Sequence, residues 1–341
     1  MAPKPLYREV LKAAWQTTWH YKRLLFWGLF VGLLGNAGEY QFLISSFDRA
    51  AGTEIMPPTA QSLLNAPPVT AASVNGLWGA LTGDVFSAFI VLLIGLMIIA
   101  SVVFLIWLTM ISVVSLVRAA AAVAAGNAPD SLNKAATSAQ PFFGPVLILY
   151  VFGRLLGWLL LTLLAFFGLL VMQDFLIGFP IFIVAFILLL PALFVISFAT
   201  RYAIIFTILD RLPLLEAIDR AVALTRRYWL ISVELAFILF AVNLALGILL
   251  AIVVALLVAP ILLAAYMVLS TGLIAGALSL FILGVALFLL SLFCVGATLG
   301  TFQWTAWSHL FLKLKEPGKT SKIVRVFSKW IRNRPVRLAR T

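Results

Sequence analysis

RLPLLEAIDRAVALTRRYW, residues 211–229, is a charged, helix-patterned segment between two hydrophobic runs that are each long enough to cross a bilayer. Pro213 suits the first position of a helix, acidic residues fall in its early turns, and two arginines end it. Apolar residues recur on one side at spacings of three and four, while Glu216 and Arg220 form an i, i+4 pair on another side. The segment is therefore predicted to be an amphipathic helix at a membrane surface that leads directly into a span.

The composition of the whole chain agrees with a membrane setting. The 341 residues are 64% hydrophobic and 11% charged, with a mean hydropathy of +1.13. Soluble domains are about 45–50% apolar and about 25% charged. No polar segment is long enough to build a separate soluble core. We therefore predict an all-α polytopic membrane protein, with a single membrane domain over residues 1–312 and a basic, amphipathic cytoplasmic tail over residues 313–341.

Six hydrophobic runs are candidate transmembrane helices, because about 20 apolar residues are needed to cross about 30 Å of hydrocarbon. Within the apolar stretch 260–276, YMVLSTG (residues 266–272) is interpreted as a tight outer turn, with a surface helix or a re-entrant segment as alternatives. Residues 48–84 are predicted to form a long outer loop, since Pro, Gly and Asn punctuate them. The six predicted spans are residues 24–47, 85–117, 142–175, 177–209, 230–259 and a last one within 271–312.

Basic residues set the expected orientation of these spans. They gather in the N-terminal segment, which contains Arg8 and Lys12, in the second and fourth connections, and in the tail. Connections rich in Lys and Arg stay on the cytoplasmic side of a membrane. An even number of spans then places both termini in the cytoplasm.

A short basic-small-small pattern marks three of the cytoplasmic segments. Each copy follows a proline and precedes a hydrophobic run. The first two copies are 122 residues apart and the last two are 86 apart, and the long outer loop accounts for the difference. We therefore predict three repeats of an elbow helix plus a helical hairpin, over residues 5–117, 129–209 and 213–312. The alternative is that any protein with basic inner connections carries such helices there. The copies are Lys12-Ala13-Ala14, Lys134-Ala135-Ala136 and Arg220-Ala221-Val222.

Two stretches resemble a known family. RYAIIFTILDRLPLLEAIDRAVALTRRYW, residues 201–229, followed by an apolar run, resembles the repeated signature of uncharacterised six-span bacterial membrane proteins. These proteins are related to the membrane domain found beside some glycerophosphodiester phosphodiesterases. KRLLFWGLFVGLLGNAGEY, residues 22–40, is similar to the opening of members of that family. The resemblance implies a fold and a location in the bacterial plasma (inner) membrane. The resemblance assigns no active site to this chain, because the phosphodiesterase is a separate soluble catalytic barrel that would need roughly 250 more residues.

The residues that enzymatic chemistry requires are sparse in this sequence. Neither His20 nor His309 has a second His, Cys or carboxylate at metal-ligand spacing, and the single cysteine, Cys294, lies in an apolar run. Ser308 precedes His309, but adjacent residues on a helix point about 100° apart. A GxxxxGK[ST] phosphate loop is missing from the sequence. No catalytic residue, bound metal or cofactor is therefore expected.

Ionisable residues inside the predicted spans are the best functional clue, because a charge at mid-membrane costs at least about 2.5–3.5 kcal/mol. Arg154, Arg201 and Glu234 lie in the third, fourth and fifth spans, toward their cytoplasmic ends, and are predicted to form a buried polar cluster. The cluster is interpreted as a structural ion pair that fixes helix packing, or as a site for a polar substrate or lipid headgroup. A second, outer polar patch is predicted in the first span, formed by Asn36, Glu39 and Gln41.

The tail combines basic residues with apolar residues at helical spacing. Binding to anionic headgroups is expected, at about 1 kcal/mol per basic residue near the membrane. Docking onto an acidic protein or ribosomal RNA is the alternative. Other nucleic-acid binding is not expected, because the aromatic residues lie on one apolar stripe and are not interleaved for base stacking. The residues assigned to this membrane-surface tail are Lys322, Arg325, Lys329, Trp330 and Arg332.

Three classes of function remain. The prediction is a non-enzymatic integral membrane protein that acts as a scaffold, assembly or lipid-organising factor. Its expected partners are a bilayer with anionic headgroups and either another membrane protein or a second copy of the chain. A transporter or channel for a small polar or anionic substrate is the alternative, and an enzyme acting on lipids is the third class.

Overall fold

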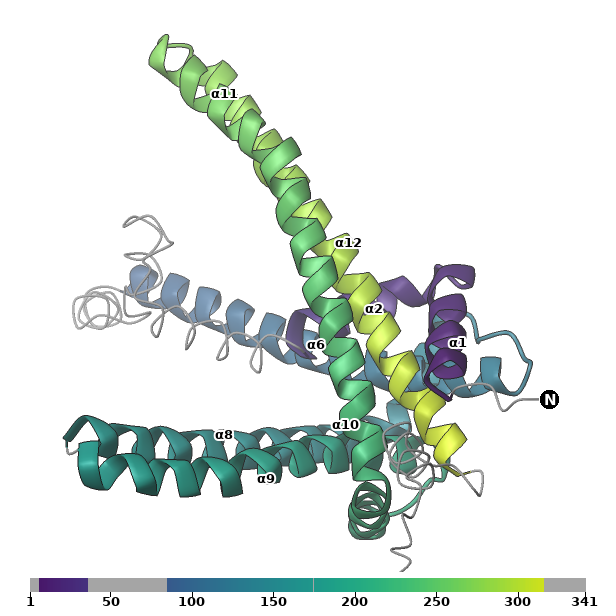
Figure 1. Ribbon diagram of the computed structural model, residues 1–341. Coiled ribbons are helices and arrows are strands. Elements are labelled where there is room, and N and C mark those ends of the chain that lie inside the picture. Colours follow the sequence, from purple (N-terminus) through teal and green to yellow (C-terminus); the bar gives the residue numbers. More distant parts are fainter. Residues whose placement is uncertain (1–5, 36–84, 174, 316–341) are drawn as a thin grey trace, which may run out of the picture. The chain divides into compact units, whose positions relative to one another are not determined.

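The computed structural model describes residues 6–35, 85–173 and 175–315, and the regular elements in these ranges are all helical (Figure 1). Five stretches of helix in the described part are long and apolar enough to cross a membrane. The all-α class is therefore confirmed. The count of six spans and the threefold repeat stay predictions, because residues 36–47 of the first predicted span lie outside the described ranges, as does the outer loop 48–84.

The chain divides into two units, residues 1–31 with 110–341 and residues 32–109. The described part of the second unit is mostly the first half of α6 (Val85–Ala124), which covers the predicted second span. Between Val85 and Leu108 its side chains are exposed or half-exposed, although nearly all of them are apolar. A helix that is apolar on all sides is typical of a membrane span, because lipid can surround it.

The first unit opens with α1 (Leu6–His20) and α2 (Leu24–Gly35), which are joined by a three-residue turn. Both helices contact α12 (Ile274–Leu314). The hydroxyl of Thr301 in α12 donates a hydrogen bond to the backbone oxygen of Leu24, at 3.2 Å. It comes this close because Gly28, one turn further along α2, has no side chain to separate the two helices.

The end of α6 belongs to the first unit and closes with a left-handed glycine. Gly126 has φ +81°, and the amide of Asn127 donates to the carbonyl of Ala122 at 2.9 Å, which is the pattern of a Schellman motif. The short α7 (Leu132–Ala139) follows, and Arg118 ties it to α6 through a 2.8 Å hydrogen bond from its Nη1 to the oxygen of Ser138. Arg118 is thus still helical, and α6 continues beyond residue 117, where the second span was predicted to end.

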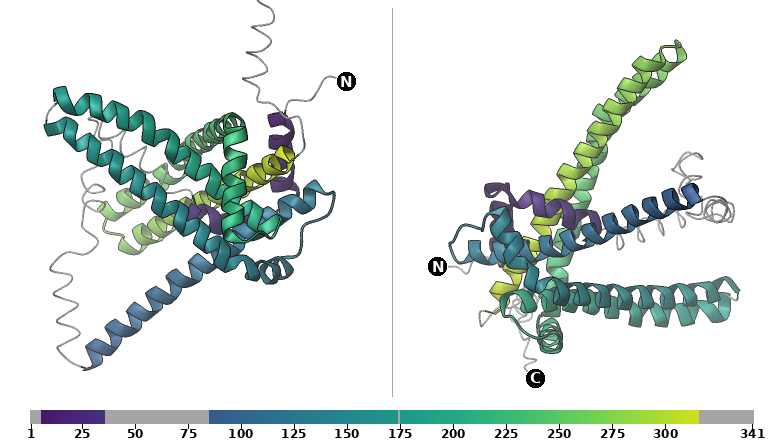
Figure 2. Two further views of the ribbon diagram at one scale, coloured as in Figure 1. Left: turned by 90° about the horizontal axis from the view of Figure 1, so that it is seen from below. Right: turned by 180° about the vertical axis from the view of Figure 1, so that it is seen from behind.

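The next two helices form a hairpin. After a short 3-10 turn, α8 (Phe143–Gln173) runs beside α9 (Phe175–Leu209) along their length in all views (Figures 1 and 2). Gly178 brings the backbones together near the tip of the hairpin, because a side chain there would overlap the backbone of Leu170. These two helices match the third and fourth predicted spans closely, and α9 ends at the predicted residue.

The stretch that opens the sequence analysis begins a longer helix, α10 (Leu214–Val253). Pro213 occupies the N-cap position, one residue before the predicted helix start, and Glu216 pairs with Arg220 at 2.5 Å as predicted. Tyr228 has φ −123° and ψ 27°, values outside the helical region, so the helix kinks there. The kink separates the charged segment from the apolar run that follows it.

The tight turn predicted within residues 260–276 is present but starts later than expected, because most of that stretch is helical. From α10 the chain continues through a π-helical turn (Val254–Val258) into α11 (Ala259–Ser270), and only residues 271–273 turn. Pro260 closely follows the π-helical turn inside this continuous helical stretch, and such a local π adjustment accommodates its missing N–H. Gly272, at φ +82°, reverses the chain into α12, which packs against α11 (Figure 1).

The buried core of the first unit lies toward one end of its long helices. Buried side chains are concentrated in the last turns of α6, α9 and α12 and in the first half of α10. The opposite ends expose Leu, Ile, Val and Phe, as helices surrounded by lipid do. The buried end is the one that the basic residues assign to the cytoplasmic side. Examples of fully buried residues are Ala120, Tyr202, Ala217, Leu235 and Leu310.

Candidate functional site

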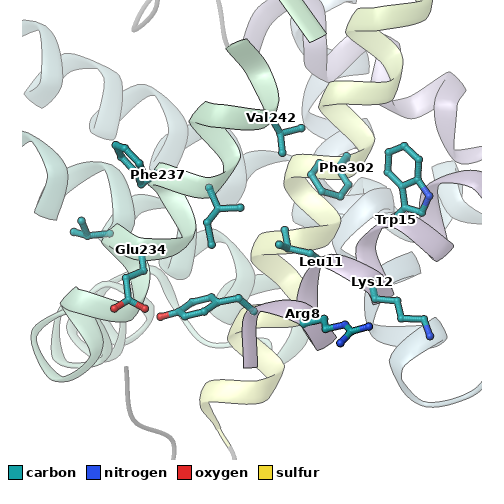
Figure 3. Close-up of a pocket in the computed structure, with 11 residues that line it drawn as sticks. Arg8, Leu11, Lys12, Trp15, Glu234, Phe237, Val242 and Phe302 are labelled. Carbon is teal, nitrogen blue, oxygen red and sulfur yellow. The ribbon is translucent and has the colours of Figure 1, made fainter. Parts of the chain in front are cut away.

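A groove with a volume of about 950 Å³ opens between α1, α10 and α12, within the first unit (Figure 3). Its wall is mostly apolar. Leu11 and Trp15 come from α1, Phe237 and Val242 from α10, and Phe302 from α12. This size and lining fall in the range of pockets that hold small ligands, about 300–1,000 Å³.

Helical periodicity explains how two of these helices present one side to the groove. On α1, Leu11 and Trp15 are four residues apart, as are Arg8 and Lys12, so one face carries both an apolar pair and a basic pair. On α10, Glu234, Ile238 and Val242 recur at the same spacing. The groove therefore has apolar walls, with charged groups placed at particular points along them.

The charges of the groove are separated in space. Figure 3 shows the carboxylate of Glu234 on one side of the groove, and the guanidinium of Arg8 and the ammonium of Lys12 on the other. Both cations are exposed, and neither has an ion-pair partner among the described residues. Glu9, between them in sequence, instead lies 3.9 Å from Lys313 of α12. One end of the groove therefore carries positive charge that is available to a ligand.

The predicted buried cluster lies on three different helices. Arg154, half-buried on α8, donates from Nη2 to the hydroxyl of Tyr150 at 3.2 Å. The guanidinium of Arg201, half-buried on α9, lies 5.2 Å from the ring centre of Trp307 on α12, in a cation–π contact. Glu234 lines the groove from α10. Arg154 and Arg201 thus each have a neighbour outside the predicted trio, and the three-residue cluster itself stays a prediction.

The other predicted site residues lie outside the described part of the chain. The outer polar patch falls within residues 36–84, and the membrane-surface tail falls within residues 316–341. Both assignments therefore stay predictions. The residues concerned are Asn36, Glu39 and Gln41, and Lys322, Arg325, Lys329, Trp330 and Arg332.

Two polar contacts between helices were missed at the sequence level. The hydroxyls of Tyr202 on α9 and Ser232 on α10 share a 2.7 Å hydrogen bond, and the amide of Gln303 on α12 donates to Asn243 on α10 at 2.7 Å. The partners are 30 and 60 residues apart, so no local spacing could pair them. The available signal was the presence of polar side chains in apolar runs, since these seek partners on neighbouring helices.

The two histidines occupy different environments. His20 is exposed at the end of α1, whereas His309 is buried in α12 with its Nε2 3.4 Å from the hydroxyl of Thr17. Among the residues that the structure describes, no three His, Cys, Asp or Glu side chains gather in a way that could hold a metal ion. His309 thus makes a polar contact between α12 and α1.

Comparison of the chain with protein-family models, with curated proteins and with solved structures gives no match. The resemblance of residues 201–229 and 22–40 to six-span bacterial membrane proteins accordingly stays a hypothesis. The functional argument rests on the groove and on the charges around it.

The contact between Asn243 and Gln303 is expected to contribute measurably to stability. In a double-mutant cycle with Asn243→Leu and Gln303→Leu, the coupling free energy should be about 0.6 kcal/mol and at most about 1.7 kcal/mol, the mean and the maximum found for hydrogen bonds between membrane helices. Unfolding by a denaturing detergent would measure it. Asn243→Leu combined with Ser279→Ala, an exposed residue near the start of α12, should be additive. Additive effects for Asn243 and Gln303 would show that the hydrogen bond does not hold α10 to α12.

Proposed function

We propose that this chain is a non-enzymatic integral membrane protein of the bacterial plasma membrane that organises anionic lipids, as a scaffold or assembly factor. The observation that carries the proposal is the groove between α1, α10 and α12, with an apolar wall and two exposed cations at one end. Five long apolar helices support insertion as a multi-pass protein. In the predicted orientation, both termini and the cationic end of the groove face the cytoplasm.

Further cations on the elbow segments support the same proposal. Lys22, Arg23, Arg226 and Arg227 are all exposed at the junctions between elbow helices and apolar helices. Near an anionic leaflet each contributes about 1 kcal/mol to membrane attraction. Exposed tryptophans accompany them, and Trp is the residue that membrane interfaces favour. Trp15, Trp19 and Trp229 are exposed to between 46% and 56%.

The composition of the lipids that co-purify with the protein tests this proposal. In mild detergent, mass spectrometry should find anionic phospholipids enriched over their share in the source membrane, and co-purifying proteins would identify assembly partners. Replacing Lys22, Arg23, Arg226 and Arg227 by Gln should reduce the enrichment, because the attraction is electrostatic. Exchanging Lys for Arg and Arg for Lys at the same positions keeps the charge, so the lipid enrichment should be preserved. A lipid-free monomer, or a bound-lipid composition equal to that of the membrane, would contradict the proposal.

A transporter or channel is the second candidate, and the carboxylate of Glu234 on the wall of the groove is the observation that favours it. Ionisable residues within apolar helices often mark the pathway of an ion or substrate. Efflux of a small anion from loaded proteoliposomes distinguishes the two candidates. Efflux that Glu234→Gln abolishes, while stability is retained, would favour transport. If efflux equals that of loaded liposomes without protein, and Glu234→Gln lowers stability, Glu234 has a structural role only.

A further inference from the structure

We infer that the groove between α1, α10 and α12 is a binding site for one anionic phospholipid, with its phosphate at Arg8 and Lys12 and its hydrocarbon along the apolar wall. The inference rests on the proposed function and adds a discrete site to it. A general attraction to anionic leaflets would involve every exposed cation, whereas this site involves two cations and one groove.

The apolar wall fits a hydrocarbon chain. Leu11, Phe237, Val242 and Phe302 line it, and Figure 3 shows these side chains arranged along the groove between the helices. An extended peptide segment placed there would set its backbone N–H and C=O groups against side chains that offer no hydrogen bonds, at a cost of several kcal/mol per group in an apolar setting. A lipid tail carries no such groups. The wall therefore selects an acyl chain over an extended peptide.

The cationic end fits a phosphate. Arg8 and Lys12 are one helical turn apart on α1, and both are exposed. An arginine fork can bind two phosphate oxygens at once, and a lysine adds a compact positive charge. Because the carboxylate of Glu234 lies at the other side of the groove, it does not oppose an anion at this end (Figure 3). The groove is thus positive where a headgroup would lie and apolar where its tail would lie.

The expected position of the groove across the membrane also suits a lipid. Trp15 lines it and is 51% exposed, and tryptophan concentrates at the level of the headgroups. From α1 the groove follows α10 into its apolar part, from Val233 to Val242. A phospholipid has this same order of groups, with a charged head at the interface and a tail directed into the hydrocarbon. No rearrangement of the lipid is needed.

The basic tail of the chain is a weaker candidate for the groove. Residues 316–341 contain eight Lys and Arg residues against one acidic residue, Glu316. Their docking would bring positive charge against Arg8 and Lys12, which is unfavourable. A second copy of the chain would bring its own basic α1 to the same place. Charge complementarity therefore selects an anionic lipid.

Lipid titration of the full-length protein, followed by native mass spectrometry in mild detergent, tests the site. Phosphatidylglycerol is compared with phosphatidylcholine of the same acyl chains. We expect one tightly bound phosphatidylglycerol, held more tightly than phosphatidylcholine. The variant carrying Arg8→Gln and Lys12→Gln should bind it about 25-fold more weakly, at about fivefold for each cation. Lys134→Gln with Arg220→Gln is the matched control, which removes two exposed cations outside the groove and should change this affinity less than twofold.

Filling the groove gives an independent test. Val242→Trp should weaken the binding of both lipids by at least tenfold, because the larger ring takes the place of the acyl chain. Leu249→Trp, on an exposed position of α10 outside the groove, should leave binding unchanged. A thermal scan of each variant verifies that it is folded. If Val242→Trp unfolds the protein, Ile238→Phe makes a smaller change in the same wall.

The results that would overturn the site are specific. Equal affinity for the two lipids, an equal loss from the Lys134 and Arg220 control, or full binding by a folded groove-filled variant would each contradict the site. A protein dimer that the Arg8 and Lys12 variant dissociates, with lipid binding unchanged, would assign the groove to a second copy. If anionic lipids still co-purify in excess while the bound lipid is insensitive to Arg8, Lys12 and Val242, the site is wrong and the proposed function stands. If anionic lipids do not co-purify in excess either, both the lipid site and the proposed function are wrong.

Discussion

Trp307→Ala is expected to lower the free energy of unfolding by about 3–5 kcal/mol, the largest effect of any single substitution considered for this protein. Trp307 lies in α12 and is only 1% exposed. Its ring centre is 5.4 Å from that of Phe198 and 5.8 Å from that of Tyr202, both on α9. Removing the indole would leave a cavity between the two helices. It would also remove the aromatic face beneath the guanidinium of Arg201, at 5.2 Å.

Unfolding in a mixed-detergent titration, followed by circular dichroism, measures this loss. Trp158→Ala is the matched control, because Trp158 on α8 is 65% exposed and its removal leaves no internal cavity. The control should change stability by less than about 1 kcal/mol, as exposed substitutions usually do. Equal losses from the two variants would mean that the contact between α9 and α12 is not the core of the first unit.

Gly28→Ala is expected to destabilise the protein by about 1–3 kcal/mol, although alanine is the better helix former. A methyl group on Gly28 would overlap the hydroxyl of Thr301 and the backbone oxygen of Ala297. The hydroxyl can rotate, but a helix backbone cannot yield locally, so α2 must move away from α12. That movement would also lengthen the hydrogen bond from Thr301 to the carbonyl of Leu24, now 3.2 Å.

A neighbouring glycine supplies the control for this second substitution. Gly296 is in α12, one residue before Ala297, and a methyl group added there meets no other atom within 4 Å. Gly296→Ala should be neutral or slightly stabilising, because only helix propensity changes. Thermal unfolding in detergent compares the two variants. Equal changes in thermal stability for Gly28→Ala and Gly296→Ala would show that α2 does not pack closely against α12 at this point.

Patterns within short stretches of sequence correctly predicted several of the helices. The run of apolar residues located α8 and α9 to within a few residues, and the Pro213 segment correctly marked the start of α10. The turn predicted within 260–276 was placed too early, because residues 266–270 continue the helix. Pro260 does not end the helix, because the π-helical turn before it accommodates the missing N–H. The true signal for reversal was Gly272, whose left-handed φ an L-residue rarely adopts.

The candidate site was predictable only in part. Glu234 was identified because a carboxylate in an apolar run is costly, and it does line the groove. Arg8 and Lys12 were identified as basic residues of an inner segment, without any connection to Glu234. The groove brings together residues that are more than 200 positions apart along the chain. No spacing within one helix contains that information.

The sequence by itself determined the class of this protein, the extent of most apolar helices and the expected side of each charged segment. These properties follow from composition, from periodicity along one helix and from the transfer cost of charges, all of which are local. Only the tertiary structure decided which helices meet, where glycine allows close approach, and that α1, α10 and α12 enclose a groove with cations at one end. The physical reason is that lipid and neighbouring helices are almost equally apolar, so hydrophobicity places a helix in the membrane without choosing its partners. Small residues and polar contacts such as Gln303 with Asn243 make that choice, and they act between residues far apart in the chain.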